Sequence, residues 1–588
     1  KMISGNAGEY AALPVLSDVV AYLPGVYVCP MLVKGNLESE TSVIFTPTGV
    51  VGSTLDFATP SVYLNTQLGD NLHITGSFLS CYDGLSTFES GFHLYPETVT
   101  GSAATSGGSM ADGTYYYTVV YEWWDAKGQL HRSAPSTQLS VAVSGGSGSG
   151  KVTLTIPSLR LTARQSPRGE VSLAVYRTVV SGTIFYRVSS VTSPTFNNPA
   201  VDSVSFADTL NDTSITGNEL LYTTGGTIEN IAPSSCSLIA GSKTRLFLAG
   251  LDDPYLVQYS KEHVQGEPVN FSDLFTMRVD PQGGPIKGLA IMDEKICMLT
   301  SRGLFYVVGD GPLDTGEQNT FTLPQYIPSN VGLEDSNSVV TCDKGILFKS
   351  EKGIHLLDRS LNTSYVGSPV EQWNSYTVSS ARVIENANEV RFTLNNGPTL
   401  VWNYFSNTWA TFTNQLAVDS ESWNTNWVFV KPSGAVYKQG TTYFDDGLPI
   451  SLSLETAWIK ISAVQSLQRI YRALFLGSFK SSHVFKVDIA YDYSDVYTES
   501  ITWDAGASLK TSYYGEDAYY GEKTPYGDEE DNVYQIRIHM PRQKCQAVKF
   551  RIYDISQAGT GESFEITHLQ LEVGVKGQAA KLKALKSA

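Results

Sequence analysis

The stretch KICMLTSRGLFYVVG, residues 295–309, decides the fold of this chain. It consists of a short apolar run, a turn that contains Gly303, and a second run rich in aromatic and β-branched residues. Two such runs joined by turn residues predict a pair of antiparallel strands. The pattern returns four times in the second half of the chain, in RLFLAGLDDPYLVQYS (245–260), GILFKSEKGIHLLD (345–358), VRFTLNNGPTLVWNY (390–404) and WVFVKPSGAVYKQ (427–439).

The spacing of the five stretches predicts stacked sheets. Their first residues lie 50, 50, 45 and 37 positions apart, and periods of about 40 to 50 residues with several strands in each are typical of β-propeller blades. A single blade cannot bury both of its faces, so blades must pack against one another around an axis. The sequence therefore predicts an all-β fold built on a β-propeller, and a scaffold rather than a catalyst.

The composition agrees with a large all-β chain that carries few charges. Of 588 residues, 42% are hydrophobic and 11% aromatic, which is enough to bury several cores. Charged residues make up only 17%, against about 25% in typical domains. With 58 acidic and 41 basic residues the net charge is −17. This charge argues against a surface that binds the phosphates of nucleic acids, because such binding needs clustered Lys and Arg.

Neither the cysteines nor the hydropathy pattern indicates a specialised class of protein. No CxxC pair occurs, so we expect buried free thiols rather than a zinc site or a disulfide framework, at Cys29, Cys81, Cys236, Cys297, Cys342 and Cys545. No apolar run is long enough to cross a bilayer, which predicts no membrane span. The printed sequence begins with Lys, and a signal peptide ahead of it stays an open alternative.

The first part of the chain divides into blades and an inserted module. Residues 1–97 hold short apolar runs and the Asp83-Gly84 turn pair, and are interpreted as the opening blades. Residues 98–225 hold Ser/Gly/Thr-rich stretches between period-two segments at 113–123, 151–156, 171–177 and 184–191. The phrase GTYYYTVVYEWWDAKGQLHRSAPS resembles fibronectin type III-like modules. A fibronectin III-like β-sandwich inserted between blades is therefore predicted.

The second part continues the blades and ends in another sheet domain. Residues 226–440 contain the five repeated stretches and are assigned to the remaining blades. Residues 441–577 carry longer alternating runs, which predict a C-terminal β-sandwich. Within them, Trp458–Arg472 also fits an amphipathic helix, but the β-rich surroundings favour a strand. Residues 578–588 form a basic C-terminal tail, which we expect to be mobile or to dock on a partner.

The sequence lacks the motifs of catalytic and metal sites. It contains no G-x-S-x-G, H-E-x-x-H or P-loop pattern. The eight histidines are not spaced like metal ligands, and a structural, hydrogen-bonded role is expected for His73, His93 and His355. We therefore expect no enzyme activity and no cofactor.

Carboxylates keep one enzymatic alternative open. Propellers that cleave sugars need two carboxylates about 5 to 10 Å apart in a cleft. The candidates mostly adjoin Gly in turns, where Asp is common without catalysis: Asp83, Glu89, Asp310, Asp343 and Asp358. No sialidase-type Asp-box, S-x-D-x-G-x-x-T-W, occurs in any blade.

Two segments are candidate partner-docking sites. The acidic, Tyr-rich stretch Tyr513–Asn532 lacks the residue order of a calcium loop, so a hairpin tip that orders against a neighbour is favoured over a Ca²⁺ site. The basic tail is the second segment. The candidate docking residues are Tyr513, Tyr514, Tyr519, Tyr520, Lys581, Lys583 and Lys586.

Aromatic residues provide a further candidate surface. Alternation should bury half of the first group, Tyr115 to Trp124, and the other tryptophans can pack between blades. The number of aromatic residues still exceeds the need of one core, so we expect some of them to meet another subunit. The candidates are Tyr115, Tyr116, Tyr117, Trp123, Trp124, Trp402, Trp409, Trp423 and Trp427.

Six phrases follow one another in a distinctive order: HITGSFLSCYDGLSTFESGFHLYPE, YYYTVVYEWWDAKGQLHRSAPS, SKTRLFLAG with VQYSKEH, IKGLAIMDEKICMLTSRGLFYVVGDGP, CDKGILFKSEKGIHLLD and ITHLQLEVGVKGQAAKL. In this order they resemble the tail nozzle family of short-tailed bacteriophages, also called tail tubular protein B or tail stabilisation protein. The resemblance runs from about Leu72 to Lys583. Its specificity lies in the order of the phrases, because each phrase alone is a generic strand pair.

The resemblance implies a structural virion protein of the phage tail. Members of the family are β-propeller proteins that form a ring, typically six-fold, below the adaptor ring of the portal. The implied partners are five further copies of the chain, the adaptor or head-to-tail connector, tail fibres or tailspikes, and a plug or needle protein. Double-stranded DNA would pass through the ring during ejection without specific binding. The resemblance transfers no functional residue one by one.

The net charge fits a DNA conduit. Each phosphate neutralised by Lys or Arg adds affinity through counterion release, which slows passage. Six copies would carry roughly −100 charges, although salt screens such a field within about 8 Å. Two alternatives stay open: a carbohydrate-binding or glycan-cleaving β-propeller of a virion or cell surface, and an adhesion protein that uses the sandwich as a module.

Overall fold

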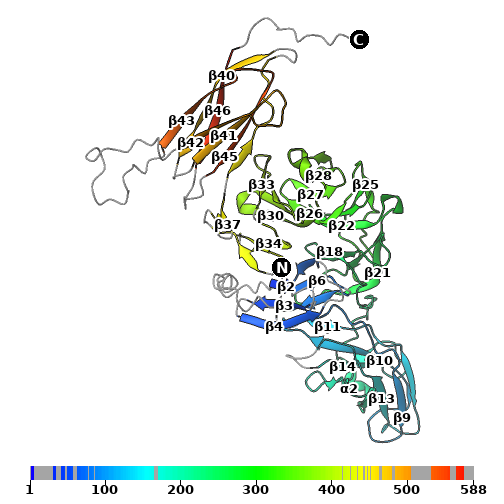
Figure 1. Cartoon of the computed structure of the whole chain (residues 1–588). Coiled ribbons are helices and arrows are strands. Elements are labelled where there is room, and N and C mark those ends of the chain that lie inside the picture. Colours follow the sequence, from blue (N-terminus) through cyan, green and yellow to red (C-terminus); the bar gives the residue numbers. More distant parts are fainter. Residues whose placement is uncertain are drawn as a thin grey trace. The chain divides into compact units, whose positions relative to one another are not determined.

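A computed structural model describes most of the chain between residues 63 and 574. It gives the backbone at 2–4, 31–34, 41–46 and 49–56, then residues 63–555 with breaks at 77, 85–86, 165–169, 414, 424–425, 433–434, 441–443, 446–447, 451, 463–466, 480–483 and 505–531, and finally 564–574. The described residues are almost all strands and turns (Figure 1). The chain divides into two compact units, residues 1–439 and 440–588.

Outside residues 98–225, the described strands of the first unit form seven sheets, which follow one another in chain order. The first two sheets are β1 (Met2–Ser4), β2 (Met31–Lys34), β3 (Thr41–Thr46) and β4 (Gly49–Asp56), then β5 (Asn65–Leu68), β6 (Asn71–Ile74), β7 (Ser80–Tyr82) and β8 (Thr87–Glu89). Neighbouring strands pair antiparallel, except that β1 and β2 are parallel.

Five further sheets follow residues 98–225. The first three are β18 (Leu238–Gly241), β19 (Leu246–Ala249), β20 (Leu256–Ser260) and β21 (Phe271–Arg278); β22 (Ile286–Met292), β23 (Lys295–Thr300), β24 (Leu304–Val307) and β25 (Gln325–Ile327); and β26 (Asp335–Cys342), β27 (Gly345–Ser350), β28 (Gly353–Asp358) and β29 (Thr363–Tyr365). The last two are β30 (Val378–Ile384), β31 (Glu389–Leu394), β32 (Thr399–Asn403) and β33 (Thr408–Phe412); and β34 (Asp419–Trp423), β35 (Asn426–Val430) and β36 (Val436–Lys438). Short 3-10 turns lie at Pro281–Gly283, Ser368–Trp373 and Glu385–Ala387.

The five repeated stretches confirm the predicted strand pairs, because each forms the second and third strands of one sheet. Strand β23 shows why these strands are apolar throughout. Ile296 and Met298 lie in the core shared with sheet β18–β21, whereas Cys297 and Leu299 lie in the core shared with sheet β26–β29. Both faces of the sheet are therefore buried, and a continuous apolar run replaces the usual alternation.

The first strands of successive sheets lie beside one another. Strand β5 contacts β18, and contacts then run from β18 to β22, β26, β30 and β34 in order. Strand β34 also contacts β1, at the start of the chain. Sheets arranged radially approach one another most closely at their inner strands. This all-β succession of mainly four-stranded antiparallel sheets is consistent with a β-propeller.

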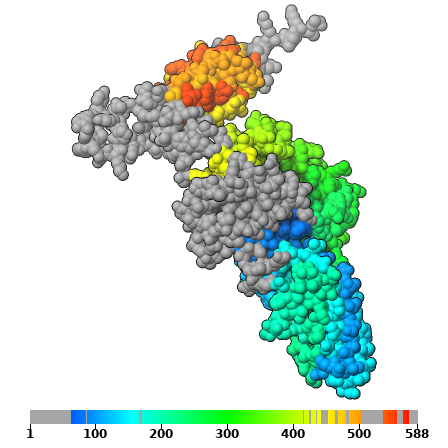
Figure 2. Space-filling view, turned by 60° about the horizontal axis from the view of Figure 1, so that its bottom comes forward, coloured from blue at the N-terminus to red at the C-terminus, as the bar shows by residue number. Residues whose placement is uncertain are grey.

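Residues 98–225 form two sheets packed face to face. One sheet holds β10 (Gly113–Trp124), β11 (Leu130–Arg132), β12 (Leu139–Val143), β14 (Ser172–Arg177), β15 (Tyr186–Arg187) and β16 (Thr195–Phe196). The other holds β9 (Thr100–Ala104), β13 (Lys151–Pro157) and β17 (Ser203–Asp208), and one helical turn, α2, spans Asp212–Ile215. Alternate residues of β10 and β13 meet in one core. Figure 2 shows these residues, coloured blue to green, forming one continuous surface.

The second unit also contains two sheets around one core. Its strands are β37 (Phe444–Asp445), β38 (Leu448–Pro449), β39 (Ser453–Glu455), β40 (Gln468–Phe479), β41 (Val484–Tyr491), β42 (Glu499–Asp504), β43 (Asn532–His539), β44 (Lys544–Cys545), β45 (Val548–Asp554) and β46 (Phe564–Gly574). Strands β37 and β38 form a hairpin. One sheet has the order β39-β45-β41-β42, and the other places β40 between β43 and β46. Phe475, Phe485 and Phe550 join the two sheets.

Three local predictions are refined by the structure. The run 184–191 contains only the short strand β15; within it Arg187 N donates to Glu219 O, and just after it Val188 N donates to Val175 O. The described part of Trp458–Arg472 is not helical: Ile459 bridges to Val548, and strand β40 begins at Gln468. The cysteines that the structure describes are free and buried, as predicted, at Cys81, Cys236, Cys297, Cys342 and Cys545.

Five of the candidate aromatic residues are buried, as the expected alternation and packing between blades require. Tyr115, Tyr117 and Trp123 are buried in the core of the inserted module, and Trp402 and Trp427 are buried between sheets. The excess of aromatic residues is absorbed by several separate cores rather than by one. Trp124 does remain exposed.

Candidate functional site

The predicted docking residues fall outside the part of the chain that the structure describes. They lie in two segments, 505–531 and 575–588, and comprise Tyr513, Tyr514, Tyr519, Tyr520, Lys581, Lys583 and Lys586. Their docking role stays a prediction.

The three histidines singled out from the sequence differ in environment. His355 fits the structural role, because its Nδ1 lies 3.1 Å from Ser350 Oγ and 3.0 Å from Gly353 O. His93 is exposed and meets Phe78 edge-on. His73 is buried, yet neither ring nitrogen has a hydrogen-bond partner. The hydrogen-bonded role predicted for His73 is therefore wrong.

The five candidate carboxylates fall in three places. Asp83 and Glu89 are buried where sheet β5–β8 meets the inserted module, Asp310 follows β24, and Asp343 and Asp358 flank strands β27 and β28. Glu89 lies in strand β8, not in a turn, and is bonded to Arg164. This distribution gives the glycan-cleaving alternative no support.

A buried ion pair fixes the inserted module on sheet β5–β8. Arg164 comes from the inserted module, and its Nη1 donates to Glu89 Oε1 at 2.6 Å. Its Nη2 donates to the carbonyls of Glu89 and Gly91, both at 2.8 Å. The guanidinium carbon lies 4.0 Å from the centre of the Phe92 ring. Because the Arg164 side chain is fully buried, these partners replace the hydration of its two Nη groups, whereas its Nε has no hydrogen-bond partner.

A second polar contact lies beside the ion pair. Asn71 of β6 donates through Nδ2 to Asp125 Oδ2 at 3.1 Å and to Gln129 Oε1 at 2.9 Å. Asp125 also lies 3.1 Å from His131 Nε2. Burial works against ionisation of Asp125, but hydrogen bonds from His131, Gln129 and Asn71 hold its pKa below the ordinary value. The contact therefore favours a charged carboxylate.

The neighbouring histidines stay neutral. Burial lowers the pKa of His73 to about 3, and the nearby His131 and His263 act in the same direction. Burial also lowers the pKa of His131, although its bond to Asp125 opposes the shift. Protonation of this contact is therefore unfavourable in the folded chain.

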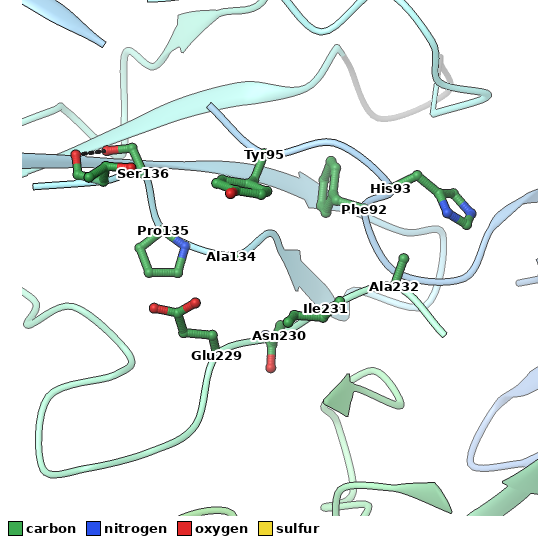
Figure 3. A pocket seen from close by; sticks show the side chains of 11 residues that line it. Phe92, His93, Tyr95, Ala134, Pro135, Ser136, Glu229, Asn230, Ile231 and Ala232 are labelled. Carbon is green, nitrogen blue, oxygen red and sulfur yellow. Dashed lines mark hydrogen bonds between the residues drawn. The ribbon is translucent and has the colours of Figure 1, made fainter. Parts of the chain in front are cut away.

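A cavity of about 380 Å³ opens where the two connections to the inserted module pass each other. It lies between residues 92–95, which lead into the module, residues 229–232, which lead out, and the loop 134–137. Figure 3 shows Tyr95 and Phe92 on one side, with Glu229 facing them across the opening and Pro135 beside it. Tyr95 is 40% exposed, whereas Phe92 is buried.

The charges near the cavity nearly cancel. Lys261 lies behind the connection 229–232, where its Nζ donates to Asn230 Oδ1 at 2.8 Å and to Ile228 O. Burial lowers the pKa of Lys261 to about 8, against the attraction of Asp314 and Glu229. Partial desolvation lowers the pKa of His93 as well. The cavity thus has one carboxylate, a nearby ammonium and a neutral imidazole.

Sequence reasoning missed the buried polar contact and the cavity. Arg164 lies in the phrase LTARQS, which no local feature separates from an exposed turn. Asp125 does have a signal, because the phrase DAKGQ predicts a turn that its carboxylate closes by accepting from Lys127 N and Gln129 N. The residues that line the cavity lie up to more than a hundred positions apart in the sequence, so no short motif indicates it.

The described residues include neither a metal cluster nor a membrane-spanning helix. No cluster of three or more His, Cys, Asp or Glu side chains could hold a metal ion there. No helix in that part of the chain is long and apolar enough to cross a membrane.

Comparisons with known proteins place the chain in no family. No family model matches it, and no curated protein matches it. Among solved structures, it is similar to Sqt1 of Saccharomyces cerevisiae, with a TM-score of 0.29 and 9% identity over 68% of this chain and 90% of that chain.

Two other solved structures are similar at the same level. The exo-beta-1,3-galactanase of Phanerochaete chrysosporium gives a TM-score of 0.22 at 8% identity, covering 58% of this chain and 97% of that chain. The extracellular domain of the putative hybrid two component system BT4673 of B. thetaiotaomicron gives a TM-score of 0.26 at 11% identity. The match covers 70% of this chain and 41% of that chain. At such TM-scores these likenesses carry no argument about function.

Proposed function

We propose that this protein is a structural virion protein, one subunit of the ring-shaped tail nozzle of a short-tailed bacteriophage. The nozzle would extend the DNA channel below the portal and adaptor, and would serve genome retention and ejection. The observation that carries the proposal is the order of six phrases, from HITGSFLSCYD to ITHLQLEVG, which resembles that of the tail nozzle family. The finer fold proposed with it is a β-propeller with a fibronectin III-like insertion and a C-terminal β-sandwich.

The phrases fall on several different sheets, which supports the resemblance as a property of the whole chain. The first phrase covers β6 to β8, the second covers β10 and β11, and later phrases cover β19, β20, β22 to β24, β27, β28 and β46. A chance similarity of one strand pair would be confined to one sheet. Here the similarity extends over both compact units.

Exposed apolar side chains on outer strands support contacts with other subunits. Leu274 on β21, Tyr326 on β25 and Tyr365 on β29 are 67%, 52% and 40% exposed. Phe405, in the turn between β32 and β33, is 84% exposed. Single exposed apolar residues are common on monomers. Their recurrence on four successive sheets is what a ring subunit with lateral contacts would need.

The charge of the chain supports passage of DNA without capture. The net charge of −17 gives a ring of six roughly −100 charges, so phosphates near the wall would be repelled rather than bound. The proposed partners are a homo-hexameric ring, the adaptor, tail fibres or tailspikes, and a plug or needle protein. The proposed location is the tail of the virion.

Native mass spectrometry and negative-stain class averages of the purified chain test the proposal, with and without a portal–adaptor complex. A closed ring with an axial hole that docks on the adaptor is the expected result. A stable monomer that does not bind the adaptor would contradict the proposal. Leu274→Asp should reduce ring formation, whereas Leu161→Asp serves as the matched control, at a Leu of the inserted module that is 78% exposed.

A further inference from the structure

We propose that the cavity between Tyr95 and Glu229 binds one ring of a neutral sugar. The cavity is formed by three segments, the two connections to the inserted module and the loop 134–137 within it. Its volume of about 380 Å³ is near the lower end of the range of about 300 to 1,000 Å³ typical of ligand pockets. A single small ring suits this size better than a peptide segment.

The two sides of the cavity match the two chemical faces of a sugar ring. Tyr95 offers a partly exposed aromatic ring, and Phe92 extends the apolar wall beside it. Glu229 lies on the opposite side, and it is an exposed residue. Aromatic rings bind the C–H face of a sugar, whereas a carboxylate accepts hydrogen bonds from its hydroxyl groups. The hydroxyl groups of Tyr95 and Thr137 are further polar groups of the lining.

The electrostatics favour a neutral ligand over an ion. The lining contains no Lys or Arg, so no cation there pairs with a phosphate or an acidic sugar. The Lys261 ammonium, held behind Asn230, offsets the charge of Glu229, so the attraction for a cation is weak as well. His93 adds no positive charge near neutral pH, because its pKa lies below the ordinary value. The remaining interactions are hydrogen bonds and apolar contact.

The inference is independent of the nozzle proposal. The cavity belongs to a single chain and needs no ring. Failure to form a ring would leave sugar binding intact, and failure to bind sugar would leave ring formation intact. Sugar binding by a tail protein would give the particle a contact with glycans of a cell surface.

Saturation-transfer difference NMR on the full chain tests the inference. The probes are glucose, galactose and N-acetylglucosamine as neutral sugars, with glucuronic acid and tetramethylammonium as charged controls. We expect saturation transfer to at least one neutral sugar, with a Kd on the order of 1 mM or weaker, and none to the charged probes.

Two variants locate the binding. Tyr95→Ala removes the aromatic wall, and Glu229→Gln keeps the shape but removes the charge. Each should weaken binding by about tenfold or more. Tyr493→Ala is the matched control, because Tyr493 is also an exposed tyrosine, at 52%, but belongs to the second compact unit. It should bind like the unchanged chain, and equal melting temperatures would show that all variants are folded.

Three outcomes would overturn the inference. The first is no saturation transfer to any of the neutral sugars at about 20 mM. The second is binding that Tyr95→Ala and Glu229→Gln leave unchanged, which would place the sugar elsewhere. The third is binding of tetramethylammonium in place of the sugars, which would make the cavity a site for organic cations.

Discussion

The contact between sheets β22–β25 and β26–β29 and the contact between sheet β5–β8 and the inserted module are built from different chemistry. Between sheets β22–β25 and β26–β29 the core is apolar, with Leu299 and Phe348 among its fully buried members. At the inserted module, Arg164, Glu89 and Asp125 are buried. Arg164 donates a hydrogen bond to Glu89, and Asp125 accepts one from Asn71. The first contact depends on apolar area, and the second on a buried ion pair and hydrogen bonds. Other neighbouring sheets also share polar contacts, such as Arg382 of β30 with Glu421 of β34.

The difference concerns how strictly each contact specifies its partner. Apolar faces gain free energy from area and shape, so related residues can replace one another at small cost. Buried ionic groups depend on distance and direction, and each group left without its partner is costly. Repeated sheets can therefore share one interchangeable face, whereas the inserted module is attached in one orientation.

The largest effect is expected from the buried arginine. Arg164→Met keeps much of the length of the side chain but leaves the Glu89 carboxylate buried without its cation, and should lower the free energy of unfolding by about 3 to 5 kcal/mol. Arg164→Lys should not restore stability, because an ammonium cannot reach Glu89 and Gly91 with the same planar geometry. Urea denaturation followed by the fluorescence of the nearby Trp123 measures both.

The matched control for this prediction is Arg160→Met. Arg160 lies four positions earlier and pairs with Asp202, but both side chains are exposed. Exposed pairs contribute only about 0 to 1 kcal/mol. Equal costs for Arg160→Met and Arg164→Met would contradict the view that burial makes the second pair specific.

The apolar interface provides the next test. Leu299→Ala removes a fully buried side chain between two sheets and should cost about 2 to 5 kcal/mol. Leu299→Met keeps the volume and should cost less than about 1.5 kcal/mol. A conservative change is thus tolerated here but not at Arg164. If Leu299→Met were as damaging as Leu299→Ala, the apolar faces would be as strictly specified as the polar contact.

The polar contact should also make stability depend on pH. His73 has a pKa of about 3 in the folded chain and about 6.5 when unfolded. Its contribution to stability is complete above about pH 6.5 and is lost as the pH falls toward 3, by about 1.4 kcal/mol per unit. From pH 7.5 to 5.0 this loss is about 2 kcal/mol. His131 and His263, whose pKa values are also lowered, act in the same direction.

His73→Leu isolates this contribution. Leucine removes two buried nitrogens that have no hydrogen-bond partner, so the variant should be at least as stable at pH 7.5 and should lose about 2 kcal/mol less between pH 7.5 and 5.0. Urea denaturation at the two pH values measures the difference. An unchanged pH dependence would show that other groups carry it.

The same comparison explains how far the sequence predicts the structure. Phrases such as KICMLT and GILFKS predict their strands because the fold requires apolar residues on both faces, and this requirement is visible in each strand by itself. The attachment of the inserted module is not visible, because Arg164 and Glu89 lie 75 positions apart and each alone resembles a surface residue. The cavity below Tyr95 depends on that attachment and was missed for the same reason.

The smallest effect is expected at an exposed ion pair between sheets. Arg359, in the turn after β28, pairs with Asp293, in the turn after β22, and both side chains are substantially exposed. Arg359→Ala should therefore cost no more than about 1 kcal/mol, and less in 1 M NaCl, where the Debye length falls to about 3 Å. A cost close to that of Arg164→Met would mean that polar contacts also hold the sheets together. The division between apolar sheet contacts and a polar attachment would then fail.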